Sequence, residues 1–112
     1  MSNLFDLTGK VSIVTGSGRG LGKAIALGMA EYGATVITCS RTLAEAEATA
    51  AEIRAAGGTA LGLRVDTADR ASCQQLVTDT VAAFGKLDVL VNNAGIDIIE
   101  PAEDVKIGRA HV

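Results

Sequence analysis

The chain has 112 residues, and ten Lys and Arg against thirteen Asp and Glu give it a formal net charge of −3. Hydrophobic residues make up 48% of the sequence, which holds 13 glycines and one proline. This composition is typical of one packed globular domain and excludes a disordered or collagen-like chain. Because the charge is acidic overall and no long Lys/Arg block occurs, we expect neither a nucleic acid nor an anionic membrane surface as a partner.

Membrane insertion, secretion and metal binding are also disfavoured. No run approaches the roughly 18 consecutive apolar residues of a membrane-spanning helix, and the first ten residues lack a basic flank and an apolar signal core. We therefore expect a cytoplasmic protein. Cys39 and Cys73 are unpaired in spacing and the sequence has one histidine, so we expect neither a disulfide framework nor a metal site, and interpret both cysteines as small buried hydrophobic residues.

Four short apolar runs rich in Val, Ile and Leu predict β-strands. They cover residues 11–15, 35–39, 60–65 and 89–91. The first and the last are nearly continuous in apolar residues, which is typical of parallel strands covered on both faces.

A helical segment follows the first strand. Gly33 is positioned to end this helix in a left-handed cap. Its apolar face, at helical spacing, is formed by Leu21, Ile25, Gly28, Met29 and Tyr32. We interpret Tyr32 as a packing residue whose hydroxyl lies near solvent.

The second helical segment carries start and stop signals. Thr42 and Glu45 match a capping box, in which each side chain bonds a free backbone N–H of the other residue. Gly57 and Gly58 end the segment. Its predicted apolar stripe is Leu43, Ala46, Ala50 and Ile53.

A third helical segment begins near Thr67 or Asp69 and ends at Gly85. Its predicted buried face is Leu76, Val77, Val81 and Phe84. Strands and helices therefore alternate from the first strand to the fourth. This alternation predicts an α/β protein with a Rossmann-like, doubly wound parallel sheet, strand order 3-2-1-4 and helices on both faces.

A glycine-rich turn opens the first helix. The segment directly after the first strand reads Thr15-Gly16-Ser17-Gly18-Arg19-Gly20-Leu21-Gly22. Glycine lacks a Cβ, so such a turn can tighten and bring its N–H groups against a pyrophosphate at the positive end of the helix. Because a strand precedes the turn and a helix follows it, we expect a dinucleotide-binding site rather than a purely structural turn.

The end of the second strand bears on which dinucleotide binds. A carboxylate there accepts hydrogen bonds from the ribose hydroxyls and repels a 2′-phosphate, whereas this chain has Ser40 and Arg41. With Arg19 as a second cation, the pattern favours NADP(H) over NAD(H). The alternative is that Arg41 only solvates the start of the next helix, where a cation opposes the helix dipole.

The two motifs together resemble the short-chain dehydrogenase/reductase family. Its Thr-Gly-x-x-x-Gly-x-Gly signature is matched by residues 15–22, and its Asn-Asn-Ala-Gly signature by residues 92–95. The likeness begins at Phe5 and runs to about Pro101. By resemblance, residues 1–105 are the N-terminal part of a single NAD(P)-binding Rossmann domain.

The resemblance adds further cofactor-binding residues. It implies that Asp66 contacts the adenine and that Thr67, which follows it, also belongs to the cofactor site. Asn93, Ala94 and Gly95 are implied to pass under the ribose and nicotinamide, while Asn92 braces the central strand. Alternatively, Asp66 caps the following helix, and residues 92–95 form an ordinary strand-ending turn.

The family's catalytic Ser and Tyr-x-x-x-Lys follow the Asn-Asn-Ala-Gly stretch and are not matched in this sequence, where Tyr32 has no Lys four positions on. We assign no catalytic residue and expect the first half of a longer, homo-oligomeric enzyme. Residues 107–112 read as a translated sequencing-library adapter, so we interpret 106–112 as a non-native tail. We also expect the strand at 89–91 to present an apolar edge.

Two hypotheses follow for function. The first is the NADP(H)-binding half of a short-chain oxidoreductase that interconverts a secondary alcohol and a ketone by hydride transfer, with a small carbonyl or alcohol substrate. The second is a dinucleotide sensor of the same fold without hydride chemistry. A Tyr-x-x-x-Lys motif downstream in the gene would favour the enzyme, and the 112 residues alone are expected to show no turnover.

Overall fold

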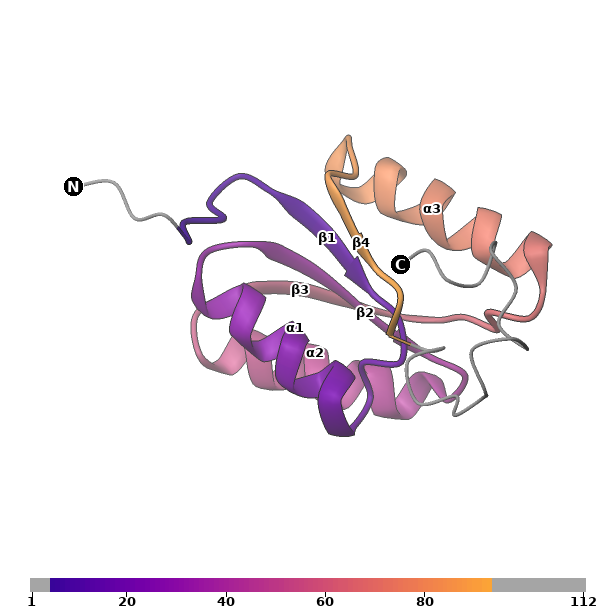
Figure 1. Cartoon of the computed structure of the whole chain (residues 1–112), viewed down its shortest axis with the longest axis horizontal. Helices are drawn as coiled ribbons and strands as arrows, with labels where there is room; N and C mark the ends of the chain where they lie inside the picture. Colours follow the sequence, from indigo (N-terminus) through magenta and orange to yellow (C-terminus); the bar gives the residue numbers. More distant parts are fainter. Residues whose placement is uncertain (1–4, 94–112) are drawn as a thin grey trace, which may run out of the picture.

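The computed structural model describes residues 5–93. Four parallel strands form one sheet in the order β3-β2-β1-β4, and three helices connect them (Figure 1). The strands are β1 (Val11–Val14), β2 (Thr35–Ser40), β3 (Thr59–Arg64) and β4 (Val89–Val91), and the helices are α1 (Gly20–Glu31), α2 (Leu43–Ala55) and α3 (Arg70–Phe84). The predicted fold class and strand order are therefore confirmed.

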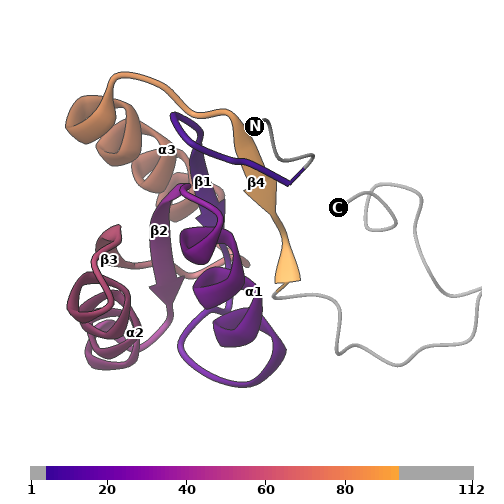
Figure 2. The same cartoon turned by 90° about the vertical axis from the view of Figure 1, so that its left-hand side faces the viewer.

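Helices cover both faces of the sheet. Figure 2 shows α1 and α2 on one face and α3 on the other. Alternate residues of β2 divide between the two layers, with Val36 packed under α1 and α2 and Ile37 under α3. β1 and the middle of β2 lie between the two layers, so their side chains are buried. The continuous apolar run therefore predicted burial correctly for β1 but not for β4, whose residues are half-buried or exposed.

The fourth strand pairs with β1 on one side within the described residues. Leu90 is 51% exposed, while Val89 and Val91 are half-buried. The prediction of an apolar edge is confirmed for Leu90. None of the helices within residues 5–93 is long and apolar enough to cross a membrane.

The predicted helix ends agree with the backbone. Gly33, Gly57 and Gly85 all adopt positive φ, at 102°, 94° and 82°. This left-handed conformation is readily adopted only by glycine, so each stops its helix. At the start of α3, the Asp69 side chain accepts a hydrogen bond from the Ala71 N–H at 3.0 Å.

The predicted capping box at the start of α2 is wrong. Thr42 occupies the N-cap position, but its side chain makes no capping hydrogen bond. The Thr42 N–H, which the glutamate of a capping box would accept, donates instead to Ser40 Oγ at 3.1 Å. Glu45 is therefore free of that role.

The predicted apolar faces are only partly correct. Leu21, Leu43, Val77 and Val81 are exposed, and Cys73 is half-buried where a buried thiol was expected. On α3, the residues that face the sheet are Cys73, Leu76, Thr80 and Phe84. Val77 and Val81 directly follow the buried residues Leu76 and Thr80, so their side chains are rotated by about 100° around the helix and do not contact the sheet.

Candidate functional site

The glycine-rich turn lies at the carboxyl end of β1. Gly16 and Gly20 have φ of 64° and 60°, which a side chain would strain. Arg19, at the N-cap of α1, is extended and makes no side-chain capping bond, so the first N–H groups of the helix have no side-chain cap. The turn therefore presents main-chain donors at the positive end of a helix dipole, an arrangement that binds phosphate.

Two glycines of the turn are required for close packing. A Cβ at Gly22 would lie 2.8 Å from the carbonyl carbon of Gly16 and 2.5 Å from Nδ2 of Asn93. A Cβ at Gly18 would lie 2.8 Å from Cβ of Glu45. Only glycine at these positions lets the turn fold against α1 and α2.

The side chain of Ser17 ties the turn to β2. Ser17 is fully buried, and its Oγ accepts a hydrogen bond from the Cys39 N–H at 2.8 Å. The Ser17 N–H in turn donates to the Cys39 carbonyl at 3.0 Å. The hydroxyl is thus occupied with backbone groups, and the structure does not bring it into the cavity described next.

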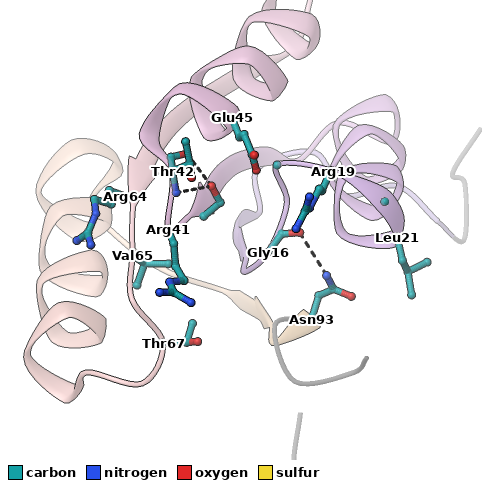
Figure 3. A pocket seen from close by; sticks show the side chains of 13 residues that line it. Gly16, Arg19, Leu21, Arg41, Thr42, Glu45, Arg64, Val65, Thr67 and Asn93 are labelled. Atoms are coloured by element: carbon teal, nitrogen blue, oxygen red, sulfur yellow. Dashed lines mark hydrogen bonds between the residues drawn. The ribbon is translucent and has the colours of Figure 1, made fainter. Parts of the chain in front are cut away.

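A cavity of about 870 Å³ opens at the carboxyl ends of β1, β2 and β3, beside the glycine-rich turn (Figure 3). This volume is within the range of small-molecule sites. Its lining comprises Gly16, Gly18, Arg19, Gly20, Leu21, Ser40, Arg41, Thr42, Glu45, Arg64, Val65, Thr67 and Asn93. Nine of the predicted site residues are therefore brought together at one cavity: Gly16, Gly18, Arg19, Gly20, Leu21, Ser40, Arg41, Thr67 and Asn93.

The cavity is basic although the chain is acidic. Its lining carries three arginines, Arg19, Arg41 and Arg64, against one carboxylate, Glu45. Within residues 5–93, no carboxylate lies at ion-pair distance from these arginines, whereas Arg54 lies 4.0 Å from Glu47. The site therefore offers uncompensated positive charge to an anion.

Ser40 organises the end of β2. Its hydroxyl donates to the Thr42 carbonyl at 2.7 Å and accepts from the Thr42 N–H at 3.1 Å. These local bonds shape the bend that leads into α2 and place Arg41, which is exposed, in the lining of the cavity.

The Asn-Asn pair joins the end of β4 to β1 and the turn. Asn92 Oδ1 accepts a hydrogen bond from Thr15 Oγ1 at 3.2 Å, in agreement with its predicted bracing role. Asn93 Nδ2 donates to the Gly16 carbonyl at 3.3 Å. Ala94, Gly95 and the predicted tail at 106–112 lie outside the described residues.

Asp66 and Thr67 follow β3 but differ in position. Thr67 lines the cavity and Asp66 does not. Asp66 Oδ1 accepts from the Ala68 N–H at 3.0 Å, which bends the chain toward α3. Because Asp69 holds the N-cap position of α3, the alternative interpretation of Asp66 as the cap of that helix is wrong.

Sequence reasoning missed four residues of the cavity lining: Thr42, Glu45, Arg64 and Val65. Arg64 was placed inside the third strand, and only its pairing with Ser40 across the sheet shows that it lies at the same edge. The capping-box pattern predicted a local role for Glu45 at the start of α2, and nothing in the sequence indicated that Glu45 packs against Gly18 and lines the cavity.

A parallel sheet in this order, with a phosphate-type glycine turn and a cavity at the carboxyl strand ends, defines the class of Rossmann-like nucleotide-binding folds. The family described as short chain dehydrogenase matches residues 10–110. The chain belongs to this family.

Relatives and solved structures agree with the assignment. The chain is 50% identical over 93 residues, 83% of its length, to an uncharacterized oxidoreductase of Mycobacterium tuberculosis, of which it covers 35%. It is 43% identical over 105 residues, 93% of its length, to 2-dehydro-3-deoxy-D-gluconate 5-dehydrogenase of Pseudoalteromonas atlantica, of which it covers 41%. A structure of 7α-hydroxysteroid dehydrogenase complexed with NADH and 7-oxo glycochenodeoxycholic acid matches with a TM-score of 0.77 and 35% identity, over 82% of this chain and 37% of that one. The chain thus spans well under half the length of these relatives.

Proposed function

We propose that this chain binds a nicotinamide dinucleotide in the cavity of Figure 3, as part of a short-chain oxidoreductase that interconverts a secondary alcohol and a ketone. The observation that carries the proposal is one cavity that is lined by a glycine turn, by a helix N-terminus without a side-chain cap, and by three arginines that have no ion-pair partner within residues 5–93. The names of two relatives, a gluconate derivative 5-dehydrogenase and D-threitol dehydrogenase, support an alcohol or ketone on a polyhydroxylated carbon chain as the substrate class.

The described residues fit the dinucleotide. A Cβ at Gly18 would collide with Glu45 and one at Gly22 with Gly16, so glycine is required for the turn to fold into the shape that receives a diphosphate. The free N–H groups at the start of α1 supply donors to the phosphate oxygens. When bound, the nicotinamide supplies the hydride chemistry, and this chain holds and orients the cofactor.

NADP(H) is the favoured dinucleotide of this proposal. Ser40 and Arg41 stand at the end of β2, where a carboxylate would select NAD(H). A guanidinium at this edge can bind a 2′-phosphate through charge-assisted hydrogen bonds. The neutral Ser40 hydroxyl adds no negative charge at the end of β2 that would repel such a phosphate.

Equilibrium titration of the 112-residue chain with NADPH and NADH tests the proposal. We expect NADPH to bind at least tenfold more tightly, because a charged hydrogen bond is worth about 1.5–3 kcal/mol. Equal affinities, or tighter binding of NADH, would refute the preference. Failure of both dinucleotides to bind would refute the site.

A substitution at Ser40 provides the matched variant. Ser40→Asp keeps an acceptor for the Thr42 N–H but adds a carboxylate at the end of β2. We expect this variant to lose its preference for NADPH and to bind NADH at least as tightly as the native chain. Arg70→Met removes an exposed arginine outside the cavity and should leave both affinities unchanged.

A further inference from the structure

We propose that Arg64, at the end of β3, is a specificity-determining residue that binds the 2′-phosphate of the dinucleotide together with Arg41. This inference rests on the proposed function. Arg64 would add a contact from the end of β3 to those expected from Ser40 and Arg41 at the end of β2 and from Arg19 in the glycine turn.

The strand register places Arg64 beside Ser40. The two residues are paired in the parallel ladder of β2 and β3. Partners in register on neighbouring strands direct their side chains to the same face of the sheet. Ser40 and Arg64 therefore emerge side by side at the carboxyl edge, and both line the cavity.

The face on which they emerge is known from the residues two positions earlier. Thr38 Oγ1 donates to the Ala46 carbonyl in α2 at 2.8 Å, and a Cβ at Gly62 would lie 2.9 Å from the same carbonyl. Since side chains alternate along a strand, Ser40 and Arg64 face the α2 layer too. Both residues lie at the strand ends, level with the first turn of α2, which begins at Leu43. At this level Ser40 is only half-buried and Arg64 is exposed.

The surroundings of Arg64 distinguish it from a structural arginine. Arg54 Nη1 donates to the Ala60 carbonyl at 2.9 Å, and Arg54 also lies 4.0 Å from Glu47. Among residues 5–93, Arg64 has no such hydrogen bond or ion pair through its side chain. Its guanidinium is free to bind a ligand.

The charge of the lining matches the ligand. Three arginines and one glutamate give the cavity a formal charge of +2 within a chain of −3. A phosphate monoester carries a charge of about −1.5 to −2 near neutral pH. The net positive charge of the lining therefore complements the negative charge that the additional phosphate of NADP(H) carries.

The arginines are divided between two sides of the cavity. Figure 3 shows Arg41 beside Val65 on the β2–β3 side, Arg64 on the same side with its side chain extending away from Arg41, and Arg19 beside Gly16 on the side of the glycine turn. The turn is the diphosphate-binding part of the site. Arg64 should therefore respond to the 2′-phosphate and hardly at all to the 5′-phosphate.

Calorimetric titration of the 112-residue chain with adenosine 2′,5′-bisphosphate and with AMP separates these contributions, because the two probes differ only by the 2′-phosphate. We expect Arg64→Met to weaken binding of the bisphosphate at least tenfold and to change AMP binding less than twofold. Arg64→Lys, which keeps the charge but not the planar fork, should give an intermediate loss. Arg70→Met is the matched control and should change neither affinity.

The outcomes distinguish this inference from the proposed function. If the native chain binds both probes equally, the preference for NADP(H) and the role of Arg64 both fail. If the native chain favours the bisphosphate and Arg64→Met keeps that preference in full, only the role of Arg64 fails. A loss of affinity for AMP equal to that for the bisphosphate would also overturn it, since it would indicate a general electrostatic or structural effect. Circular dichroism of both Arg64 variants checks that the fold is retained, and Arg64→Lys still tests the proposal if Arg64→Met does not fold.

Discussion

The side-chain amide of Asn93 donates a hydrogen bond to the main-chain carbonyl of Gly16 at 3.3 Å, across 77 positions of sequence (Figure 3). A Cβ at Gly22 would fall against both partners. The end of β4, the glycine turn and the start of α1 therefore meet at one crowded point. The shape of the candidate dinucleotide site depends on this junction.

Substitution of Gly22 by alanine tests the junction. The added methyl group would lie 2.8 Å from the carbonyl carbon of Gly16, and main-chain atoms cannot move aside without shifting the turn. We expect Gly22→Ala to lower the free energy of unfolding by about 3 kcal/mol and to weaken nucleotide binding. Urea denaturation and titration with NADPH measure the two effects.

Gly28→Ala is the control for Gly22→Ala within the same helix. A Cβ at Gly28 has open space around it. Alanine there should raise the free energy of unfolding by up to about 1 kcal/mol, because glycine is the poorer helix former. Equal behaviour of the two variants would contradict the packing argument.

Ser17 is expected to contribute to stability through hydrogen bonding. Ser17→Ala leaves the buried N–H of Cys39 without its acceptor. An unsatisfied buried donor costs about 1–3 kcal/mol, so the urea midpoint should fall accordingly. Thr49→Val is the contrasting variant, since the buried Thr49 hydroxyl has no hydrogen-bond partner in the part of the chain that the structure describes. It should be neutral or stabilising, and a larger loss than for Ser17→Ala would overturn the interpretation.

Glu45 is expected to oppose anion binding. It is the carboxylate of the cavity lining and lies over Gly18. Glu45→Gln keeps the size of the side chain, and removing its charge should tighten NADPH binding about two- to tenfold. Glu47→Gln, on the exposed face of the same helix, should have no effect on the dissociation constant. Weaker binding by Glu45→Gln would instead indicate that the carboxylate accepts a hydrogen bond from the ligand.

Asp88 should make stability depend on acid pH. The Val11 N–H donates to its Oδ2 at 2.8 Å, and this bond, followed by the one from Lys86, lowers the pKa of Asp88 below its ordinary value of 3.8. A lowered pKa in the folded state stabilises the protein above pH 3.8, and this contribution is lost as the pH falls through the folded value.

Asp88→Asn tests that pH dependence. The variant should have a lower urea midpoint than the native chain at pH 7, and the difference should shrink as the pH falls below 3.8 and through the lowered pKa of the folded carboxyl, where the native side chain becomes protonated as well. Urea denaturation at a series of pH values measures this. A deficit of the same size at every pH would mean that the charge of Asp88 plays no part.

Local sequence chemistry predicted many of the residues that line the cavity. The glycines of the turn could be found because a tight turn before a helix requires them at fixed spacing. Ser17 was also included, yet its hydroxyl bonds to Cys39 and faces away from the cavity. Whether a turn residue faces inward or outward depends on the strand beside it, which lies more than twenty residues further along the chain.

The sequence by itself determined the order of strands and helices, the ends of the helices at Gly33, Gly57 and Gly85, and the position of the phosphate-type turn. These features depend on hydrophobic periodicity and on backbone conformations available to glycine, both of which act between near neighbours. Only the tertiary structure decided that Arg64 stands beside Ser40 and that Glu45 faces the cavity. Strand register and the rotation of a helix about its axis are set by contacts between distant segments, and no local pattern contains them.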